Sequence, residues 1–376
     1  MTVQRPAARK KRIIINVLNI TDEHLAGAAI FSRNVLSAWL IREDDMEVTI
    51  LHSSKIDATR VLQLPQKPGV RTKGVPVGGF LSRIVYEQVV MPFTVRGYDI
   101  YFSPTQILPF ISRVLFRKTR MVTTVHDMIP FFVKNKYGYL RTQYVRLISK
   151  WGPVFSDSVV VVSENTLKDV VQLTGISPSK IHVVYNFLTS DYEPNNLNDG
   201  KYFICISTVE PGKNLENTLS GFARFIEKYQ RQDYSFYWLG KIGWGYTAEE
   251  LNGKIAQAGL QNKFHLLGFV KESEKQQLLE GCSAMIYLSH YEGFGIPVLE
   301  GLYHNKPAVV SRSSSLPEVI GSAGILCDHK NVEEIADSMQ EMITNLHRYR
   351  AFIPAQIRKF KKEVQIKNFM KVIHGL

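Results

Sequence analysis

The stretch of sequence that decides the fold is Tyr291–Gly301, which reads YEGFGIPVLEG. A short apolar run, residues 284–288, precedes it and has the composition of a buried strand. A helix is expected to follow, because Pro297 suits the first position of a helix, where its missing N–H is not needed. The sequence therefore predicts a strand, a glycine turn and the start of a helix, in that order.

Two carboxylates, Glu292 and Glu300, stand eight residues apart in this stretch. We expect Glu292 in the turn and Glu300 in the first turn of the helix. Free N–H groups at a helix start bind anions or polar ligands, and glycines let a ligand approach the backbone. One ligand could then contact both carboxylates. The simpler alternative is an ordinary strand-to-helix turn whose acid is favoured by the helix dipole.

The length and composition indicate a globular protein of two domains. A chain of 376 residues exceeds the ~250–300 residues at which single cores stop growing. No apolar run approaches the ~20 residues of a membrane-spanning helix, and the apolar run after the basic residues 1–12 is too short and too polar for a signal peptide. The three cysteines are widely spaced in apolar surroundings, which indicates buried thiols in a reducing compartment. We therefore expect a cytoplasmic protein.

The net charge of +12 lies in the first half of the chain. Residues 1–187 carry 25 Lys and Arg against 13 Asp and Glu, whereas residues 188–376 carry 21 of each kind. A basic half indicates an anionic partner, which could be a nucleic acid, an acidic membrane surface or a phosphorylated substrate.

Strand and helix patterns alternate in two consecutive runs, separated by the polar residues 186–201. This predicts an α/β protein with two doubly wound, parallel-sheet domains, residues 1–187 and 188–352, and a final helix in residues 353–376 that crosses back to the first domain. Ligands bind at the carboxyl ends of such strands, so the cleft between the domains is the expected site. Strands are expected at residues 13–17, 46–51, 98–103, 120–125, 158–162 and 182–185, and then at 202–206, 236–240, 264–267, 285–288, 308–310 and 324–327.

Three residues that follow strands are candidates for chemistry. His126 could donate hydrogen bonds near neutral pH, and Lys213 and Lys241 could bind phosphate; a structural histidine and solvated lysines are the alternatives. The sequence has no Asp-x-Asp triplet to hold a metal on a diphosphate, no phosphate-binding Gly-x-x-x-x-Gly-Lys loop and no Gly-x-Ser-x-Gly elbow. No Gly-x-Gly-x-x-Gly follows the first strand, which argues against a dinucleotide dehydrogenase.

The motif Glu292-x7-Glu300 closely resembles the signature of the retaining glycosyltransferases of family 4, which have the GT-B fold of two facing Rossmann-like domains. The resemblance covers nearly the whole chain. One departure is Gly212, which stands where many members have arginine. Further segments that resemble family motifs are Gly27-Ala28-Ala29 in the loop after the first strand, His126-Asp127, Ser163–Thr166, Val209–Asn214 and Ser313–Glu318.

The resemblance implies a nucleotide-sugar donor held mainly by the second domain, with no metal and no other cofactor. By analogy, Glu300 would bind the ribose, and Glu292 would meet the transferred sugar. Lys213 would neutralise the leaving diphosphate, and His126 would bind a sugar hydroxyl near the reacting carbon. The other donor-binding positions implied are Gly27, Thr208, Lys241, Val270, Glu272, Gly293, Phe294, Gly295 and Ile296.

The donor suggested by the resemblance is GDP-mannose, because the motifs are similar to those of bacterial polysaccharide mannosyltransferases and Glu272 could accept two N–H groups of guanine. A UDP-sugar is the alternative. Neither signature carboxylate is expected on the face of the sugar that a double displacement needs, so the resemblance favours same-face attack. The acceptor, a glycan or a lipid-linked diphosphate, would dock on the basic first domain.

Basic and aromatic residues are interleaved in the first domain in a way that suits an anionic membrane. We expect the protein on the inner face of the plasma membrane, although a solvated basic surface is the simpler alternative. A nucleic-acid-binding protein would leave Glu292 and Glu300 without a role, so no nucleic-acid partner is expected; a sugar-binding module without catalysis is a further alternative. The interleaved residues of the first domain form two groups. One has Arg113, Arg117, Lys118 and Arg120 with Phe110, Leu115 and Phe116, and the other has Lys134, Lys136, Arg141, Arg146 and Lys150 with Tyr137, Tyr139, Tyr144 and Trp151.

Overall fold

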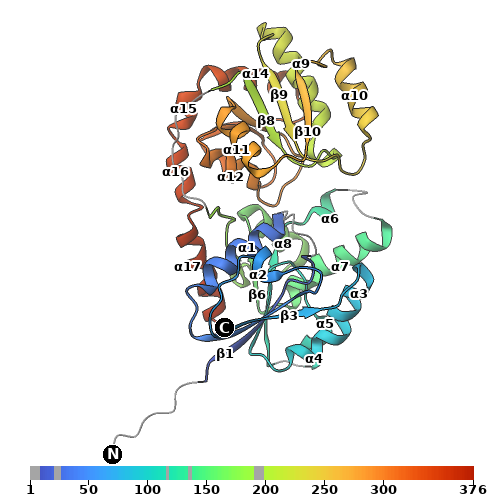
Figure 1. The fold of residues 1–376 in the computed structure, drawn as a ribbon, viewed down its shortest axis with the longest axis vertical. Helices are drawn as coiled ribbons and strands as arrows, with labels where there is room; N and C mark the ends of the chain where they lie inside the picture. The colour runs from blue at the N-terminus through green and yellow to red at the C-terminus, as the bar shows by residue number, and fades with distance from the viewer. Residues whose placement is uncertain (1–8, 21–26, 116–117, 134–137, 190–198) are drawn as a thin grey trace, which may run out of the picture.

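The computed structural model describes residues 9–20, 27–115, 118–133, 138–189 and 199–376. They form two lobes, one above the other in Figure 1, each built on a parallel sheet. The first sheet has the strand order β3-β2-β1-β4-β5-β6-β7, and the second has the order β10-β9-β8-β11-β12-β13. The predicted pair of doubly wound α/β units is confirmed.

The first lobe follows from a series of short, fully buried apolar strands joined by helices. Residues Ile13–Asn16 of β1, for example, are buried because the strand is paired with β2 on one side and β4 on the other. The elements are β1 (Lys11–Asn16), α1 (Gly27–Leu40), β2 (Met46–Ser53), α2 (Ala58–Val61), β3 (Val70–Val75), α3 (Phe80–Val85), η1 (Tyr86–Val90), α4 (Met91–Val95), β4 (Ile100–Ser103), α5 (Phe110–Leu115), β5 (Arg120–Val125), α6 (Ile129–Phe132), α7 (Tyr139–Phe155), β6 (Ser158–Val161), α8 (Glu164–Thr174), η2 (Pro178–Lys180) and β7 (Ile181–Val183).

The second lobe and the C-terminal segment repeat this alternation. The three cysteines of the chain lie here as buried free thiols, as predicted. The elements are β8 (Tyr202–Ile206), η3 (Pro211–Lys213), α9 (Leu215–Tyr229), β9 (Ser235–Leu239), α10 (Ala248–Gln257), β10 (Phe264–Gly268), α11 (Glu272–Gly281), β11 (Ala284–Tyr287), α12 (Ile296–Tyr303), β12 (Ala308–Ser311), α13 (Leu316–Ile320), β13 (Gly324–Cys327), α14 (Val332–Thr344), α15 (Leu346–Arg350), α16 (Ile353–Arg358) and α17 (Lys362–His374).

The structure differs from the prediction in a few places. Helices α3 and α4, with a π-helical turn (η1) between them, occupy residues 80–95, where no element was predicted. Apolar side chains there lie on both the buried and the exposed faces, so the segment lacks the one-sided amphipathic pattern that predicts a helix from sequence. Gly27 lies in the first turn of α1 and not in a loop, and Pro297 takes the second position of α12 and not the first.

The two lobes are tied together by the C-terminal helices. Helices α15, α16 and α17 run along one side of the molecule from the second lobe back to the first (Figure 1). The ring of Phe369 in α17 packs against Trp39 and Phe102 of the first lobe, at centroid distances of 5.3 and 5.1 Å. The side chain of Gln365 accepts a hydrogen bond from the backbone of Tyr185 at 2.9 Å.

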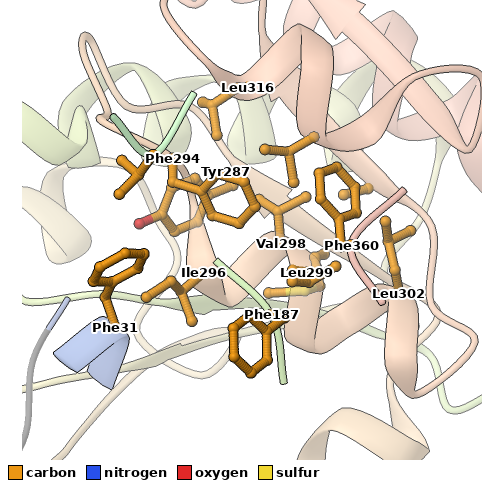
Figure 2. Close-up of a cluster of buried hydrophobic side chains, with 14 of the residues drawn as sticks. Phe31, Phe187, Tyr287, Phe294, Ile296, Val298, Leu299, Leu302, Leu316 and Phe360 are labelled. Atoms are coloured by element: carbon orange, nitrogen blue, oxygen red, sulfur yellow. The ribbon is translucent and has the colours of Figure 1, made fainter. Parts of the chain in front are cut away.

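A hydrophobic cluster continues across the boundary between the lobes (Figure 2). Phe31 and Phe187 come from the first lobe, Phe294 and Ile296 from the loop and helix start of the second, and Phe360 from the C-terminal segment. The residues around the predicted ligand turn are thus part of the contact between lobes. Among the described residues, no helix has both the length and the apolar character needed to cross a membrane.

Candidate active site

The loop between β11 and α12 is fixed in one conformation by glycine and serine residues. Gly295 has a φ of +105°, and a Cβ there would lie 2.7 Å from Leu316, so a side chain is excluded by both conformation and space. Three serines bind the loop through their hydroxyls. Ser313 donates to the carbonyl of His290, Ser315 donates to the carbonyls of Glu292 and Phe294, and Ser314 accepts from the N–H of Glu292 at 2.8 Å.

Apart from the N–H of Glu292, these contacts use the carbonyl groups of the loop, and the N–H groups that follow Glu292 stay uncommitted. Among the described residues, none accepts a hydrogen bond from the backbone N–H of Gly293, Phe294, Gly295 or Ile296. The same N–H groups stand at the start of the eight-residue helix α12, where the helix dipole is positive. N–H groups arranged in this way can bind an anion, and anion binding by this loop stays a prediction.

Lys213 lies directly against Glu292. Its Nζ is 2.5 Å from Oε1 of Glu292, and the two side chains are only 17% and 12% exposed. Burial, the largest single effect, would lower the pKa of Lys213, but the charge and hydrogen bond of Glu292 together with the effects of Tyr287 and Glu210 raise it overall, so the lysine is charged at neutral pH. Lys213 ends the short helix η3, and Asn214, at φ +59°, turns the chain into α9. The pair places one buried cation beside the uncommitted N–H groups.

Glu300 is held by a lysine that the sequence analysis did not identify. Nζ of Lys275, on α11, lies 3.1 Å from Glu300 and 3.1 Å from Glu272, so one cation joins two predicted donor-binding carboxylates. Burial raises the pKa of Glu300, and the charge of Lys275 partly offsets this. The charge of Arg33, on α1 of the first lobe, also reaches Glu300. Lys275 carries no sequence signal, because only the packing of α11 near α12 brings it to Glu300.

The first lobe meets this loop at the end of β5. A Cβ on Gly293 would lie 1.9 Å from the carbonyl oxygen of His126, so only glycine fits between the lobes here. The hydroxyl of Thr166 donates to the carbonyl of Gly293 at 3.3 Å. Tyr291 stacks on Phe132 at 4.9 Å and donates its hydroxyl to Asp169. Tyr291 and Gly293 of the stretch Tyr291–Gly301 therefore contact the first lobe.

A second contact between the lobes caps a helix. The carboxylate of Glu318, in α13 of the second lobe, accepts hydrogen bonds from the backbone N–H groups of Glu164 and Asn165 at 2.9 and 3.1 Å. These groups open α8 of the first lobe, whose N-cap is Ser163. Gln356 holds the other side of α13 by donating to the carbonyls of Glu318 and Val319.

His126 is positioned by a hydrogen bond from Nε2 to the carbonyl oxygen of Pro104, at 2.7 Å. Because a carbonyl can only accept, Nε2 carries the proton and Nδ1 is left as an acceptor. Burial lowers the pKa of His126 to about 4, against the effect of the Pro104 carbonyl, so the imidazole is neutral at pH 7. A neutral imidazole of this tautomer can accept a hydrogen bond from a sugar hydroxyl.

The remaining residues predicted to bind the donor form no hydrogen bond or ion pair with Lys213 or Glu292 in the described part of the chain. Thr208 follows β8 and is half-buried, whereas Lys241 follows β9 and is exposed. Val270 and Glu272 lie at the start of α11, and the Glu272 side chain is 69% exposed. Gly27, in the first turn of α1, has open space where a Cβ would be. Within the described residues, no group of three or more His, Cys, Asp or Glu is arranged to hold a metal ion.

Two family models together match the chain over residues 33–359. The model "Glycosyltransferase Family 4" matches residues 33–192, and the model "Glycosyl transferases group 1" matches residues 189–359. The chain belongs to glycosyltransferase family 4. The boundary between the two matches falls within the polar residues 186–201.

Curated proteins and solved structures similar to this family 4 chain agree with that assignment. "O-antigen chain mannosyltransferase B" of Escherichia coli is 26% identical over 259 residues, which are 65% of this chain and 65% of that protein, so the chain spans just under two thirds of this relative. "N-acetylgalactosamine-N,N'-diacetylbacillosaminyl-diphospho-undecaprenol 4-alpha-N-acetylgalactosaminyltransferase" of Campylobacter jejuni is 25% identical over 73% of this chain and 72% of that protein. The structure of Anabaena HepE in complex with UDP and glucose has a TM-score of 0.74 at 15% identity and covers 97% of this chain and 100% of that one, which shows a shared GT-B fold.

Proposed function

We propose that the protein transfers a hexose from a nucleotide-sugar donor to a glycan or lipid-linked acceptor in bacterial surface polysaccharide synthesis, with retention of configuration and without a metal. The observation that carries the proposal is the buried pair of Lys213 and Glu292 beside the uncommitted N–H groups of Gly293–Ile296. A departing diphosphate requires compensating positive charge. A buried lysine and a helix start supply it at this position.

The donor that we propose is GDP-mannose. Two of its N–H groups could be accepted by Glu272, and the first curated relative is named as a mannosyltransferase. The favoured alternative is a UDP-sugar, since HepE, of the same fold, is seen with UDP and glucose. In either case Glu300, held by Lys275, is the residue proposed to bind the ribose hydroxyls.

A thermal-shift panel of GDP-, UDP- and ADP-sugars in excess EDTA tests the donor. Binding to the folded state stabilises it by about 2.7 kcal/mol at a ligand concentration of 100 Kd, so the preferred base gives the largest rise in melting temperature. We expect GDP-mannose to give that rise. A larger rise with a UDP-sugar would establish the alternative, a rise that requires added Mg²⁺ would contradict metal independence, and no rise with any donor would refute the function.

The mechanism that we propose is attack by the acceptor on the same face from which the diphosphate leaves. A double displacement needs a carboxylate free to attack the opposite face. Glu292 is tied to Lys213, and Oδ1 of Asp127 accepts a hydrogen bond from Ile129 at 2.9 Å. The departing diphosphate, neutralised by Lys213, would then take the acceptor proton. A glycosyl–enzyme adduct trapped in mass spectrometry would contradict this mechanism.

We further propose that the first lobe docks on an anionic membrane that carries the acceptor. Leu81, Val85, Val89 and Phe93 recur every four residues along α3, η1 and α4, and their side chains are 76%, 57%, 53% and 63% exposed. They form an outward apolar stripe, and α5 and α7 beside it expose further apolar side chains. The acceptor named for the Campylobacter jejuni relative carries diphospho-undecaprenol, a membrane lipid.

The basic surface predicted from the sequence needs one correction. Arg113 forms a two-bond ion pair with Asp157 at 3.0 Å, and Arg120 reaches the same carboxylate at 3.3 Å. These two cations are therefore not available as the prediction assumed. Lys118, Arg141 and Lys150 are exposed. Arg117, Phe116, Lys134, Lys136 and Tyr137 lie outside the described residues.

Liposome flotation tests the membrane proposal. We expect the protein to float with vesicles that contain anionic lipid at low salt, and the double variant Leu81→Glu/Phe93→Glu to lose most of this binding, because two charges would enter the apolar stripe. Val364→Glu is the matched control, since Val364 is an exposed apolar residue on α17, 44% accessible. Absence of binding in the wild type, or equal loss in the control, would contradict the proposal.

A further inference from the structure

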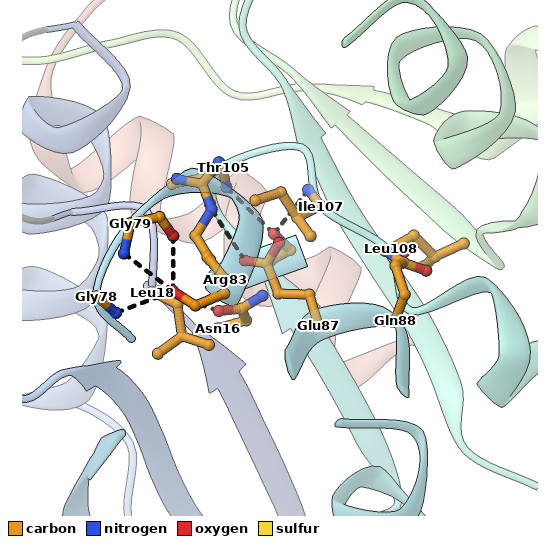
Figure 3. Close-up of polar contacts among 12 residues, drawn as sticks. Asn16, Leu18, Gly78, Gly79, Arg83, Glu87, Gln88, Thr105, Ile107 and Leu108 are labelled. Atoms are coloured by element: carbon orange, nitrogen blue, oxygen red, sulfur yellow. Dashed lines mark hydrogen bonds and ion pairs between the residues drawn. The ribbon is translucent and has the colours of Figure 1, made fainter. Parts of the chain in front are cut away.

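A fully buried carboxylate without a well-formed hydrogen bond lies in the first lobe (Figure 3). The side chain of Glu87 is 0% exposed, and neither of its oxygens is in good hydrogen-bond geometry with a partner among the described residues, although the Asn16 side chain lies close enough to lower the pKa of Glu87. Its nearest cation is Arg83, whose Nε lies 3.7 Å away, beyond hydrogen-bond distance, and is itself without a hydrogen bond. A buried carboxylate in this condition is costly, so its presence calls for a ligand.

Other polar atoms around Glu87 are in the same condition. The buried hydroxyl groups of Thr105 and Tyr144 have no partner in good hydrogen-bond geometry in the described part of the chain, although the Gln88 side chain lies close enough to lower the pKa of Tyr144. The charge of Glu87 acts on Tyr144, and the Tyr144 ring meets Phe80 edge-on at 5.6 Å. The backbone N–H of Thr105 donates to the hydroxyl of Ser103 at 3.4 Å, at the end of β4 (Figure 3). Several elements therefore place uncommitted donors and acceptors around one point.

The backbone is unusual at the same point. Glu87 belongs to the π-helical turn η1, and such turns are rare and frequent at functional sites. Gln106 has a φ of +69°, which is uncommon for a residue other than glycine. Helix α3, which carries Arg83, buries none of its residues and begins after Gly78 and Gly79. The helix thus lies at the surface of the lobe and contacts Glu87 through Arg83.

This polar cluster adjoins the proposed reaction centre. Asn16, the last residue of β1, interacts with Glu87, and Ser103, the last of β4, accepts a hydrogen bond from Thr105, so both border the cluster at the carboxyl ends of their strands. Pro104, which follows Ser103, accepts the hydrogen bond of His126, and Thr105 is the next residue. The backbone of His126 in turn contacts Gly293 of the donor loop. The cluster therefore lies on the first-lobe side of His126, away from the predicted donor residues.

We propose that Arg83, Glu87, Thr105 and Tyr144 form a subsite that binds the hydroxyl groups of the acceptor sugar. A carboxylate can accept from two neighbouring hydroxyls, a guanidinium can donate to ring oxygens, and an aromatic ring can lie against the sugar face. Glu87 repels phosphate when it is ionised, so a lipid diphosphate would lie outside the subsite. This inference rests on the proposed function and adds the residues that recognise the acceptor.

Saturation-transfer NMR on the full chain tests the subsite, with methyl α-mannoside, N-acetylglucosamine and a mannose disaccharide as probes in the presence of GDP or UDP. We expect at least one sugar to bind the wild type and to bind Glu87→Gln at least tenfold more weakly, with Thr105→Val weakened as well. Glu47→Gln, an exposed carboxylate of β2 in the same lobe, is the matched control and is expected to bind like the wild type.

A second measurement separates a binding role from a structural one. Burial raises the pKa of Glu87 to about 7, because the charged form is unfavourable away from water, so Glu87→Gln should raise the melting temperature by a few degrees. No sugar binding in the wild type, equal binding in Glu87→Gln, or a lower melting temperature of that variant would each overturn the inference. Failure of the proposed function would appear differently, as the absence of any stabilisation by nucleotide sugars.

Discussion

Replacing Lys213 by alanine is expected to lower kcat about 100- to 1000-fold, which is typical when one preorganised group that stabilises developing charge is removed. Lys213 is the buried cation paired with Glu292 beside the donor loop, and its raised pKa keeps it charged throughout the neutral range. Steady-state turnover with the donor identified by thermal shift is the measurement. Lys254→Ala, an exposed lysine of α10 at the far side of the second lobe, is the control.

The same substitution leaves Glu292 buried without its partner, so it should also destabilise the fold by about 3–5 kcal/mol. The double variant Lys213→Met/Glu292→Gln removes both charges and separates the two effects. Its stability should return towards that of the wild type, whereas its turnover should remain low. Recovery of turnover in the double variant would show that Lys213 acts only through the fold and would contradict its catalytic role.

Replacing Gly293 by alanine is expected to reduce kcat/KM at least about 100-fold, because the added Cβ would occupy a position 1.9 Å from the carbonyl oxygen of His126. The lobes could then not approach as they do in this structure, and a misplacement of about 1 Å between reacting groups can cost about 100-fold in rate. Nucleotide binding, which depends mainly on the second lobe, should change much less. Kinetics and thermal shift with the nucleotide alone separate these two effects.

Gly253→Ala is the matched control for this substitution. Gly253 lies in α10, and a Cβ there would meet nothing within 4 Å. We expect normal activity in this variant and a slightly more stable helix, since alanine has the higher helix propensity. Activity of Gly293→Ala within about threefold of the wild type would mean that the contact between Gly293 and His126 is not used in the reaction cycle.

The fold was predictable because its strands are short, apolar and regularly spaced. The stretch around Tyr291–Gly301 predicted a strand, a glycine turn and a helix, and these are β11, the donor loop and α12. The serines at 313–315 were seen in the sequence as one more family motif, but nothing in their spacing indicated that all three hold this loop. Their role depends on the neighbouring position of β12 in the sheet.

Three residues of the two sites, Lys275, Arg33 and Glu87, were not predicted, because no local sequence pattern marks them. Lys275 meets Glu300 across two helices, and Arg33 reaches it from the other lobe, so neither follows a periodic pattern in the sequence. Glu87 was also missed, because a lone glutamate in an irregular helix looks like a solvated residue. Local sequence patterns indicate elements and turns, whereas such pairings depend on how elements pack. The role of Gly293 in the contact between the lobes likewise depends on how elements pack.

The cap that Glu318 places on α8 has a mechanical consequence for the lobes. A motion that pulled the second lobe straight away from the first would break both hydrogen bonds to the Glu318 carboxylate, and a hydrogen bond to a charged group contributes about 1.5–3 kcal/mol. A rotation about the cap would keep both bonds. The cap therefore acts as a pivot, and the cleft is expected to open by swinging around α8 and α13.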